Sequence, residues 1–440
     1  MKVVNKEFTF ADLFSGIGGF HQALKSQGGR CVVASEINKD AVKVYKANFP
    51  NTKIIGDITK EWKQMPRFDV LAGGFPCQPF SKAGNQQGFD DKTSGNLFYS
   101  IIDILKEHKE CKFVILENVK NLADKNENWD IIRSELKKLN FYITEDPLIL
   151  SPTQFGIPQL RERVYILGIR KDIRDVSKLP NGFIHMEDLD DFNLLPNPRF
   201  GCNLGAATKV LEKDYGENCL LSEKEKQILD AWLEFKQITN FDKPGVPIWL
   251  DFFGYNVTDH GFKRKKFHHI EVNESGTQIK TTALISKMPK WKQHFINKNR
   301  SFYLKHKASI DIWIEKYKIL DEPLIYKKFE WNCGENGEIR DYRKTIIQFR
   351  QSGIRVKVNN YFPTLVAINN TPIIFDEKNN ILRKISPKEA ANLQSFKENF
   401  VLPDNNTTIY KQLGNAVNVE IVEKVFEKLC GFAVENWRDL

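Results

Sequence analysis

The sequence predicts an α/β fold with a Rossmann-like, doubly wound and mostly parallel sheet, joined to a second, irregular domain. Up to about residue 185, short β-rich apolar runs alternate with amphipathic segments of helical length. This alternation is typical of a parallel sheet with helices on both faces. From about residue 186 the alternation stops, and Asn, Lys and aromatic residues become more frequent. At 440 residues the chain is too long for one typical core, so we expect two domains.

The apolar runs and the segments between them give the expected elements in order. Strands are expected at 8–14, 30–36, 53–58, 68–72, 112–117, 142–150 and 163–169, and helices at 21–27, 40–48, 97–108 and 129–139. After residue 186, helices are expected at 221–235 and 309–319, and the rest as loops and irregular strands.

The alternation resumes near the end of the chain. Ser386, Pro387 and Glu389 are typical of a helix start, with Ser as the cap, Pro at the first helical position and an acid at the third. This helix should run to about Phe396, and a last helix is expected at 420–432.

The composition is that of an ordinary soluble globular protein, with 41% hydrophobic and 28% charged residues. No apolar run reaches the length of a membrane span, and the N-terminus lacks the apolar core of a signal peptide. We therefore expect a cytoplasmic protein. The seven cysteines form no CxxC pair, which argues against a disulfide framework and against a zinc site.

The net charge of +9 is concentrated in one segment. Residues 260–300 contain ten Lys and Arg but only two acids, a local net charge of +8. The densest run is Lys263, Arg264, Lys265 and Lys266. A local basic patch on an otherwise balanced protein suggests a polyanionic partner. A solvated surface loop is the alternative.

Cys77 lies between two prolines in Pro76-Cys77-Gln78-Pro79, directly after the strand expected at 68–72 and two glycines. Doubly wound folds keep their chemistry at such strand ends. A thiol held there at a fixed angle is a candidate nucleophile, although an isolated cysteine in a rigid turn is more often a small buried residue.

Three other strand ends carry groups suited to an adenosine-containing cofactor. The strand 8–14 runs into Phe14, Gly16 and Gly18, so the backbone can approach a ligand at a helix N-terminus. About 20 residues later, Glu36 is placed to accept hydrogen bonds from two ribose hydroxyls. Asp57, before Ile58, could accept from an adenine amino group.

Further polar groups converge beside this crevice. Glu117 ends the strand expected at 112–117, and Arg161 and Arg163 open the last strand of the sheet. Alone, each has an ordinary explanation, a surface Glu or an Arg paired with Glu162. Together, a thiol, an acid and two guanidinium groups meet at one edge of the sheet.

These residues resemble the DNA (cytosine-5) methyltransferases of the single-chain bacterial or phage kind, which take part in restriction–modification. The resemblance covers about the first 170 residues and the last 60. The motifs stand in the family's order: 14–19, Glu36, Asp57, 74–81, 117–119, 159–163, 383–394 and 412–415. It implies a catalytic, S-adenosylmethionine-binding domain at 1–185 and 385–440, and a target-recognition domain at 186–384, where Thr364 and Leu365 match the family's Thr-Leu element.

The resemblance implies transfer of a methyl group from S-adenosylmethionine to C5 of cytosine, leaving S-adenosylhomocysteine. Cys77 would add to C6 and make C5 nucleophilic, because a thiolate is a strong nucleophile near neutral pH. Glu117 would give a proton to N3, Arg163 would hold O2, and Arg161 would steady the loop or a phosphate. The cofactor would contact Phe14, Gly16, Gly18, Glu36, Asp57, Ile58, Pro76, Leu97 and Asn415. No metal is implied.

A cytosine stacked in a duplex must be flipped out before a thiolate can reach C6. Residues 80–96 have the composition of a mobile loop that could close over the flipped base. The residues expected to contact DNA are Ser81, Lys82, Gln86, Lys263, Arg264, Lys265, Lys266 and Thr364. The expected partner is double-stranded DNA, the expected state is a monomer in a bacterial or phage-infected cell, and a cognate restriction endonuclease would be only a genetic partner.

Four other interpretations are open to the sequence. An RNA (tRNA) cytosine-5 methyltransferase would share the fold and most motifs. A nicotinamide-dependent oxidoreductase fits the glycines and Glu36 but leaves Cys77 without a role. An amino-methylating DNA enzyme would need an Asp/Asn-Pro-Pro-aromatic motif where Pro76 and Cys77 stand. A DNA-binding protein with an inactive core would not need Cys77, Glu117 and Arg163.

Overall fold

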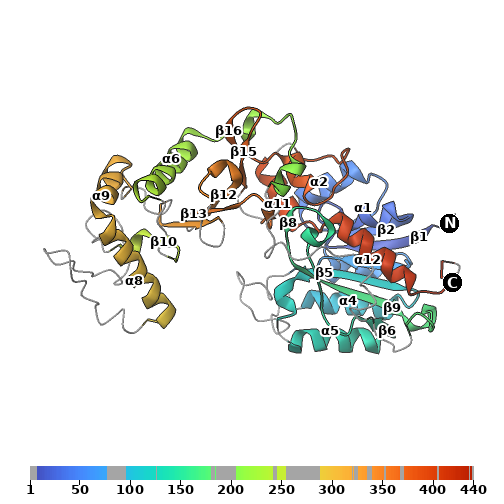
Figure 1. The fold of residues 1–440 in the computed structure, drawn as a ribbon. Helices are drawn as coiled ribbons and strands as arrows, with labels where there is room; N and C mark the ends of the chain where they lie inside the picture. The colour runs from blue at the N-terminus through green and yellow to red at the C-terminus, as the bar shows by residue number, and fades with distance from the viewer. Residues whose placement is uncertain are drawn as a thin grey trace.

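The computed structural model has two lobes that together form an arch, with both chain ends on one lobe (Figure 1). It describes residues 7–76, 96–124, 126–179, 184, 205–240, 245–253, 288–319, 321, 326–333, 339–350, 353–366, 371–403, 406–435 and 437–438. No helix within these ranges is long and apolar enough to cross a membrane.

The first lobe is built on an eight-stranded sheet. Its strands are β1 (Phe8–Leu13), β2 (Gly29–Ser35), β3 (Ile54–Ile55), β4 (Val70–Gly73), β5 (Phe113–Val119), β6 (Phe141–Ile143), β7 (Leu148–Leu150) and β9 (Arg163–Arg170). The order is β3-β2-β1-β4-β5-β9-β6, with β7 also paired to β9. Strands β1 to β5 are parallel, and β9 runs antiparallel to β5. The predicted doubly wound sheet is confirmed, and its order reverses between β1 and β4, where such folds open a crevice.

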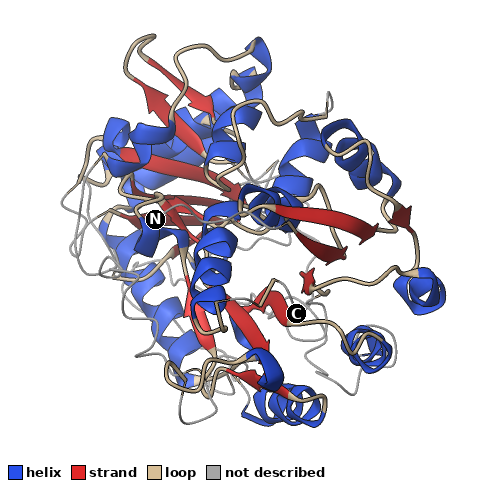
Figure 2. Ribbon diagram, turned by 90° about the vertical axis from the view of Figure 1, so that its right-hand side faces the viewer, coloured by secondary structure: helices blue, strands red, loops and turns tan. Residues whose placement is uncertain are grey.

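Helices cover both faces of this sheet, as Figure 2 shows. They are α1 (Gly19–Ser26), α2 (Lys39–Asn48), α4 (Asn96–Glu107), α5 (Asn126–Lys138) and α12 (Val419–Gly431), with the short α3 (Ile58–Glu61) after β3. Side chains alternate along a strand, so β1 sends Phe8 and Phe10 into the apolar cluster under α1, α2 and α12. Ala11 and Leu13 enter the cluster under α4 and α5.

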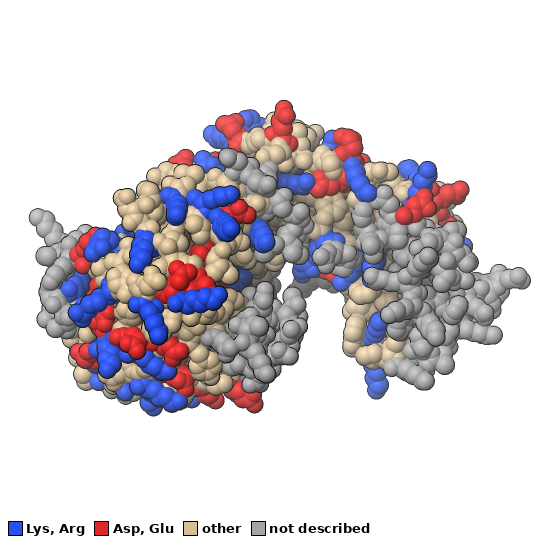
Figure 3. Space-filling model, turned by 180° about the vertical axis from the view of Figure 1, so that it is seen from behind, with Lys and Arg blue, Asp and Glu red and all other residues tan. Residues whose placement is uncertain are grey.

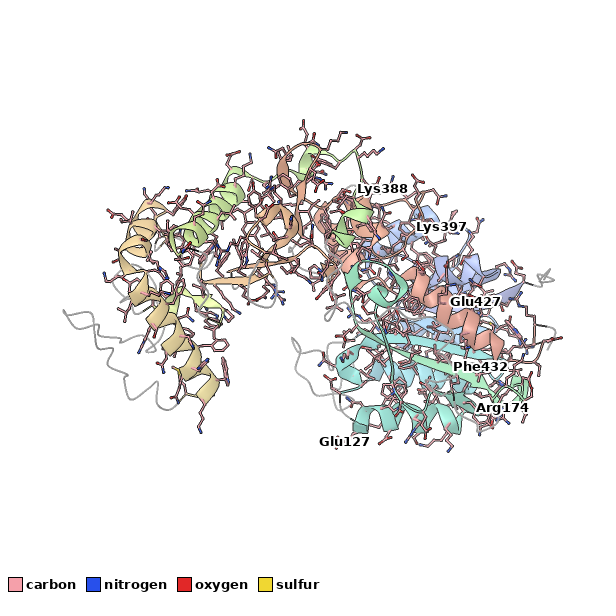
Figure 4. The ribbon with its side chains drawn as sticks, viewed as in Figure 1. Glu127, Arg174, Lys388, Lys397, Glu427 and Phe432 are labelled. Carbon is pink, nitrogen blue, oxygen red and sulfur yellow. The ribbon has the colours of Figure 1, made fainter. Side chains whose placement is uncertain are left out.

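The last helix returns to the first part of the chain, as predicted. Helix α12 packs on α1, and the Phe426 ring lies 5.0 Å from the Phe8 ring. The backbone N–H of Asp175 donates to the carbonyl of Phe432 over 2.9 Å, and Figure 4 shows Phe432 close to Arg174. The C-terminal segment is therefore part of the lobe that contains β1.

The second lobe is built on a six-stranded sheet. Its order is β10 (Ile248–Trp249), β11 (Lys328–Asn332), β13 (Gly353–Val358), β12 (Thr345–Arg350), β15 (Ile373–Asp376) and β16 (Ile381–Lys384). One face packs against α6 (Glu223–Ile238), α8 (Lys290–Lys305) and α9 (Lys307–Lys316) in a separate apolar cluster. The sequence suggested only irregular strands here, because each strand is short and lies between polar stretches. In the structure they form a regular sheet.

The two sheets are bridged by a short parallel pair, β8 (Gln159–Leu160) and β14 (Phe362–Pro363). Phe362 is fully buried in the cluster that also contains Phe8 and Phe10. A segment that follows β13 of the second sheet is thereby anchored beside the start of β9.

Several expected elements differ in extent. The run 53–58 forms only a two-residue strand, and 142–150 divides into β6 and β7. Helix α10 (Pro387–Asn392) ends before Phe396, because Ser395 adopts a positive φ of 59°. Helix α11 (Asn406–Asn415) and helix α8 were not predicted, since neither has a strong apolar stripe.

Candidate active site

The turn after β1 is an open, left-handed glycine loop at the N-terminus of α1. Gly16 and Gly18 have φ values of 54° and 96°, a region that favours glycine, and Phe14 has a φ of 53°. A Cβ on Gly18 would lie 2.4 Å from an atom of the Phe49 ring, whereas one on Gly16 would meet nothing within 4 Å. Gly18 is thus required by packing, and Gly16 borders the open side of the turn.

Glu36 follows β2 and is fixed against the glycine turn. Its Oε2 accepts a hydrogen bond from the backbone N–H of Gly16 over 2.9 Å, and its Oε1 accepts one from Asn38 over 2.7 Å. An ionised carboxylate has about four acceptor positions, so two N–H groups leave room for two hydroxyl donors. The geometry fits the ribose-binding role predicted for Glu36.

Asp57 caps the N-terminus of α3. Its Oδ1 accepts from the backbone N–H of Thr59 over 3.0 Å and from the Thr59 hydroxyl over 2.7 Å. These hydrogen bonds hold the pKa of Asp57 below its usual value. Its Oδ2 lies 3.2 Å from the Lys60 ammonium in an exposed ion pair, which is a weak interaction that an adenine amino group could replace.

The apolar side of the crevice comes from the segments after β1 and β4 and from the first turns of α3 and α4. Phe14 and Leu97 are both half-buried and pack on the cluster under α4 and α5. Ile58 is buried in the same cluster, and Pro76 is half-buried at the end of β4. The structure places these four residues, which are predicted to contact the cofactor, around one edge of the sheet.

The segment that leads to Cys77 is held by β5. The Asn118 Nδ2 donates to the carbonyl of Phe75 over 3.2 Å. A Cβ on Gly74 would lie 3.6 Å from Glu117 Oε2, so the backbone before Pro76 passes close to the Glu117 carboxylate. Some of the predicted catalytic and DNA-binding residues lie outside the described ranges. They are Cys77, Ser81, Lys82, Gln86, Lys263, Arg264, Lys265 and Lys266.

Glu117 and Arg163 form a cross-strand ion pair at this edge. The register pairs Val119 of β5 with Arg163 of β9, which puts Arg163 diagonally opposite Glu117 on the same face. Arg163 Nε lies 3.0 Å from Glu117 Oε1, and the side chains are 16% and 9% exposed. Yet that buried oxygen accepts no hydrogen bond of good geometry among the described residues. The sheet thus brings an acid and a guanidinium together, and Glu117 Oε1 can still accept a hydrogen bond.

Arg161 has a different role from Arg163. It is only 3% exposed, and its guanidinium donates to the carbonyls of Gly414 over 2.9 Å and Ala416 over 2.8 Å. These contacts hold the turn that carries the exposed Asn415. Of the two roles predicted for Arg161, holding a loop fits, and contact with a phosphate is wrong because the guanidinium is buried.

Thr364 is also tied to the site rather than free. Its hydroxyl donates to the carbonyl of Leu160 over 2.7 Å, next to the bridging pair of β8 and β14. The hydroxyl oxygen can still accept a hydrogen bond, but its proton is used within the protein.

Comparison with known proteins decides the family. The profile of the C-5 cytosine-specific DNA methylases matches residues 8–431. The chain belongs to this family. It is a DNA (cytosine-5-)-methyltransferase, and the resemblance inferred from its motifs is confirmed. The methyl donor of this family is S-adenosylmethionine.

Relatives of this methyltransferase align over nearly its full length. It is 31% identical to the type II methyltransferase M.AluI of Cellulosimicrobium cellulans, over 97% of this chain and 93% of that protein. It is 29% identical to the orphan methyltransferase M.SPRI of Bacillus phage SPR, over 95% and 96%.

Solved structures share its fold. The structure of a mutant form of Spodoptera frugiperda DNMT2 has a TM-score of 0.50 and 21% identity, covering 96% of this chain and 99% of that one. A putative DNA modification methyltransferase encoded within an Escherichia coli prophage also has a TM-score of 0.50, at 18% identity, covering 97% and 99%.

Sequence reasoning missed two groups of polar residues in this methyltransferase. Asn118 fixes the backbone before Pro76, and its place directly after Glu117 was a signal that could have been used. A buried network lies below the glycine turn: the Tyr45 hydroxyl is 2.7 Å from His21 Nδ1 and donates to Asp12 Oδ2 over 3.4 Å. Burial raises the pKa of Asp12 and lowers that of His21 to about 3.

Proposed function

We propose that this methyltransferase acts on a cytosine flipped out of double-stranded DNA, within one short recognition sequence, through a covalent bond between Cys77 and C6. The observation that carries the proposal is the Glu117–Arg163 pair, 3.0 Å apart and beside the backbone that leads into Pro76 and Cys77. A nucleophile from β4, an acid from β5 and a cation from β9 can surround one pyrimidine ring there.

The residues of the crevice fit S-adenosylmethionine. Gly16 borders open space at the N-terminus of α1, and Glu36 is already aimed at that turn with acceptor positions to spare. Phe14 and Leu97 offer a half-buried apolar wall for the adenosine. Asp57 would accept from the adenine amino group, and Asn415 would lie toward the methionine end. When bound, the cofactor supplies the methyl group that C5 of cytosine takes up.

Cys77 as a thiolate would add to C6, which moves electron density through the ring toward N3 and C5. Glu117 in its protonated form would donate to N3, and Arg163 would donate to O2. Electrostatic stabilisation of this kind acts where charge develops in the transition state. Loss of the C5 proton and then of Cys77 would restore the aromatic ring and leave 5-methylcytosine.

Arg161 and Asn118 would act through other groups. Arg161 holds the turn of Asn415, and Asn118 holds the carbonyl of Phe75. Both would therefore be positioning residues, which fix the two loops that meet at the site.

Each of the two sheets forms the centre of a domain with its own function. We place the catalytic domain at residues 1–185 and 385–440 and the target-recognition domain at 186–384. Because its relatives include type II methyltransferases, this enzyme would protect DNA in a restriction–modification system. It would act in the cytoplasm as a monomer.

The test is methyl transfer from tritiated S-adenosylmethionine to unmethylated genomic DNA, with bisulfite sequencing of the product. Label on cytosines within one short repeated sequence is expected, and Cys77→Ala should transfer none while still binding DNA. Transfer to tRNA rather than DNA would move the substrate to RNA. An unchanged Cys77→Ala rate would contradict the covalent mechanism.

A further inference from the structure

One face of the six-stranded sheet of the second lobe carries polar and charged residues, some of them buried, such as Gln348. Alternate residues of β11, β12 and β13 (Phe329, Trp331, Ile347, Ile354 and Val356) fill the apolar cluster under α6 and α9. The residues between them point the other way. Register pairs Glu330 with Arg355, and Gln348 with Arg355, so these three share the opposite face. Lys328 and Arg350, each two residues further along, share it as well.

This face holds more cations than acids. On β11, β12 and β13 the cations on this face are Lys328, Arg350, Arg355 and Lys357, and the one acid is Glu330. Asp376 of β15 is a further acid on the same face. The Glu330 carboxylate already pairs with the ammonium of Lys328, and its Oε2 lies 3.5 Å from Arg355 Nε. That nitrogen is buried and finds no hydrogen-bond acceptor in the described part of the chain. Arg350 has no ion pair to a described acid.

The positive charges of Arg350 and Arg355 also repel each other. Arg350 is half-buried, and its pKa is lowered first by that burial and then by the positive charge of Arg355. The charge of Glu330 offsets part of this repulsion, but one carboxylate that already pairs with Lys328 and Arg355 does not neutralise three cations. Cations on the helices behind the sheet are arranged differently: Lys226 lies 2.6 Å from Glu223, and Lys316 lies 2.5 Å from Glu234.

The chain runs from this sheet directly to the edge that carries the active site. Strand β13 leads through Tyr361 into β14, which pairs with β8 directly before Arg161 and Arg163. From behind, Lys and Arg side chains lie on the roof of the hollow between the two lobes, with acids among them (Figure 3). A duplex whose cytosine reaches Glu117 would pass under this roof.

We propose that Arg350 and Arg355 bind a backbone phosphate of the DNA substrate, next to the flipped cytosine. This proposal rests on the proposed function and names a phosphate contact of the same site. One phosphate would give Arg350 a counter-charge and would add a second anion for Arg355 beside Glu330. Guanidinium groups bind phosphate through paired N–H donors. Because phosphates carry no sequence information, the contact would position the duplex without selecting its sequence.

The first experiment measures binding of a fluorescein-labelled duplex by anisotropy at several KCl concentrations, with S-adenosylhomocysteine present. Arg350→Gln and Arg355→Gln should each weaken binding about tenfold on every duplex and lower the slope of log K against log salt by about 1. Lys226→Gln, which removes an exposed and paired cation behind the sheet, is the matched control and should change neither. Arg350→Lys should keep the slope.

A second measurement distinguishes a role of Arg350 in DNA binding from a role in the stability of the fold. Removing an unpaired cation should leave the melting temperature of Arg350→Gln equal to or above that of the wild type without DNA, since a repulsion is relieved. A lower melting temperature would make Arg350 a structural residue and overturn the proposal. Arg355→Gln tests the same site independently, because Lys328 still pairs with Glu330 in that variant.

The outcomes keep the two proposals apart. If the wild type methylates DNA but both Gln variants bind like Lys226→Gln, the phosphate site is wrong and the function stands. Weaker binding on the recognition sequence alone, with an unchanged salt slope, would assign the arginines to base contacts instead. If the wild type transfers no methyl group to DNA, the proposed function fails whatever the arginines bind.

Discussion

Replacing His21 by Phe should reduce the loss of stability that the catalytic lobe suffers in acid. His21 is 4% exposed, its ring stacks on Phe49 at 3.6 Å, and its Nδ1 lies 2.7 Å from the Tyr45 hydroxyl. Burial, and then the charge of nearby Lys25, lower its pKa from 6.5 to about 3. The folded protein therefore keeps this imidazole neutral in acid that protonates it in the unfolded chain.

The sign and size follow from proton linkage. Above pH 6.5 neither state binds the proton, so His21 has no effect on the pH dependence. As the pH falls from 6.5 toward 3, the unfolded state binds a proton that the folded state excludes, and stability is lost. At pH 5, about 1.5 units below the unfolded pKa, the loss is about 2 kcal/mol. The raised pKa of Asp12 acts in the opposite direction, so only a difference between variants isolates His21.

The assay is urea unfolding of the wild type and His21→Phe at pH 7.5 and pH 5.0, followed by tryptophan fluorescence. Phe keeps the ring contacts with Phe49 but cannot titrate. The difference in unfolding free energy between the two proteins should shift by about 2 kcal/mol, in favour of the variant, on going to pH 5.0. The exposed His294→Gln serves as the control and should show no shift. A difference that stays constant between the two pH values would refute the reasoning.

Three further substitutions test the loops of the site. Glu36→Gln should weaken S-adenosylmethionine binding in calorimetry by about 10- to 100-fold, because hydrogen bonds to a charged group contribute about 1.5–3 kcal/mol, while exposed Glu107→Gln should not. Arg161→Met leaves two buried carbonyls unsatisfied and should cost about 3 kcal/mol in thermal or urea unfolding, with an unchanged midpoint contradicting the clamp. Gly18→Ala places a Cβ 2.4 Å from the Phe49 ring at a φ of 96°, so it should lower the melting temperature and cofactor affinity together.

The sequence was informative where local pattern and function coincide. The apolar runs that lead to Phe14, Glu36 and Glu117 form β1, β2 and β5, and parallel strands bring such ends to one edge. Strand β5 continues two residues beyond the expected end at Glu117, to Val119. The structure gathers the described members of that set as expected. This part of the prediction needed only the order of elements and the topology of a doubly wound sheet.

Long-range contacts could not be predicted in this way. The burial of Arg161 depends on the carbonyls of Gly414 and Ala416, which lie more than 250 residues away in the chain. The region of the second sheet was expected to contain only loops and irregular strands, because its strands are short. Arg350 and Arg355 alternate there with apolar residues, as in any strand that buries one face. Their significance appears only when the register places them together.

The central claim is that Cys77 bonds covalently to the target cytosine. The most direct measurement uses a duplex with 5-fluorocytosine at the mapped target position, incubated with enzyme and S-adenosylmethionine. Fluorine at C5 cannot leave as a proton does, so the adduct should persist as a DNA-linked protein band under denaturing conditions. Mass spectrometry should place the DNA on the peptide that contains Cys77, with Cys430→Ser forming the band and Cys77→Ser forming none. A stable adduct in Cys77→Ser, or one mapped to another residue, would contradict the account.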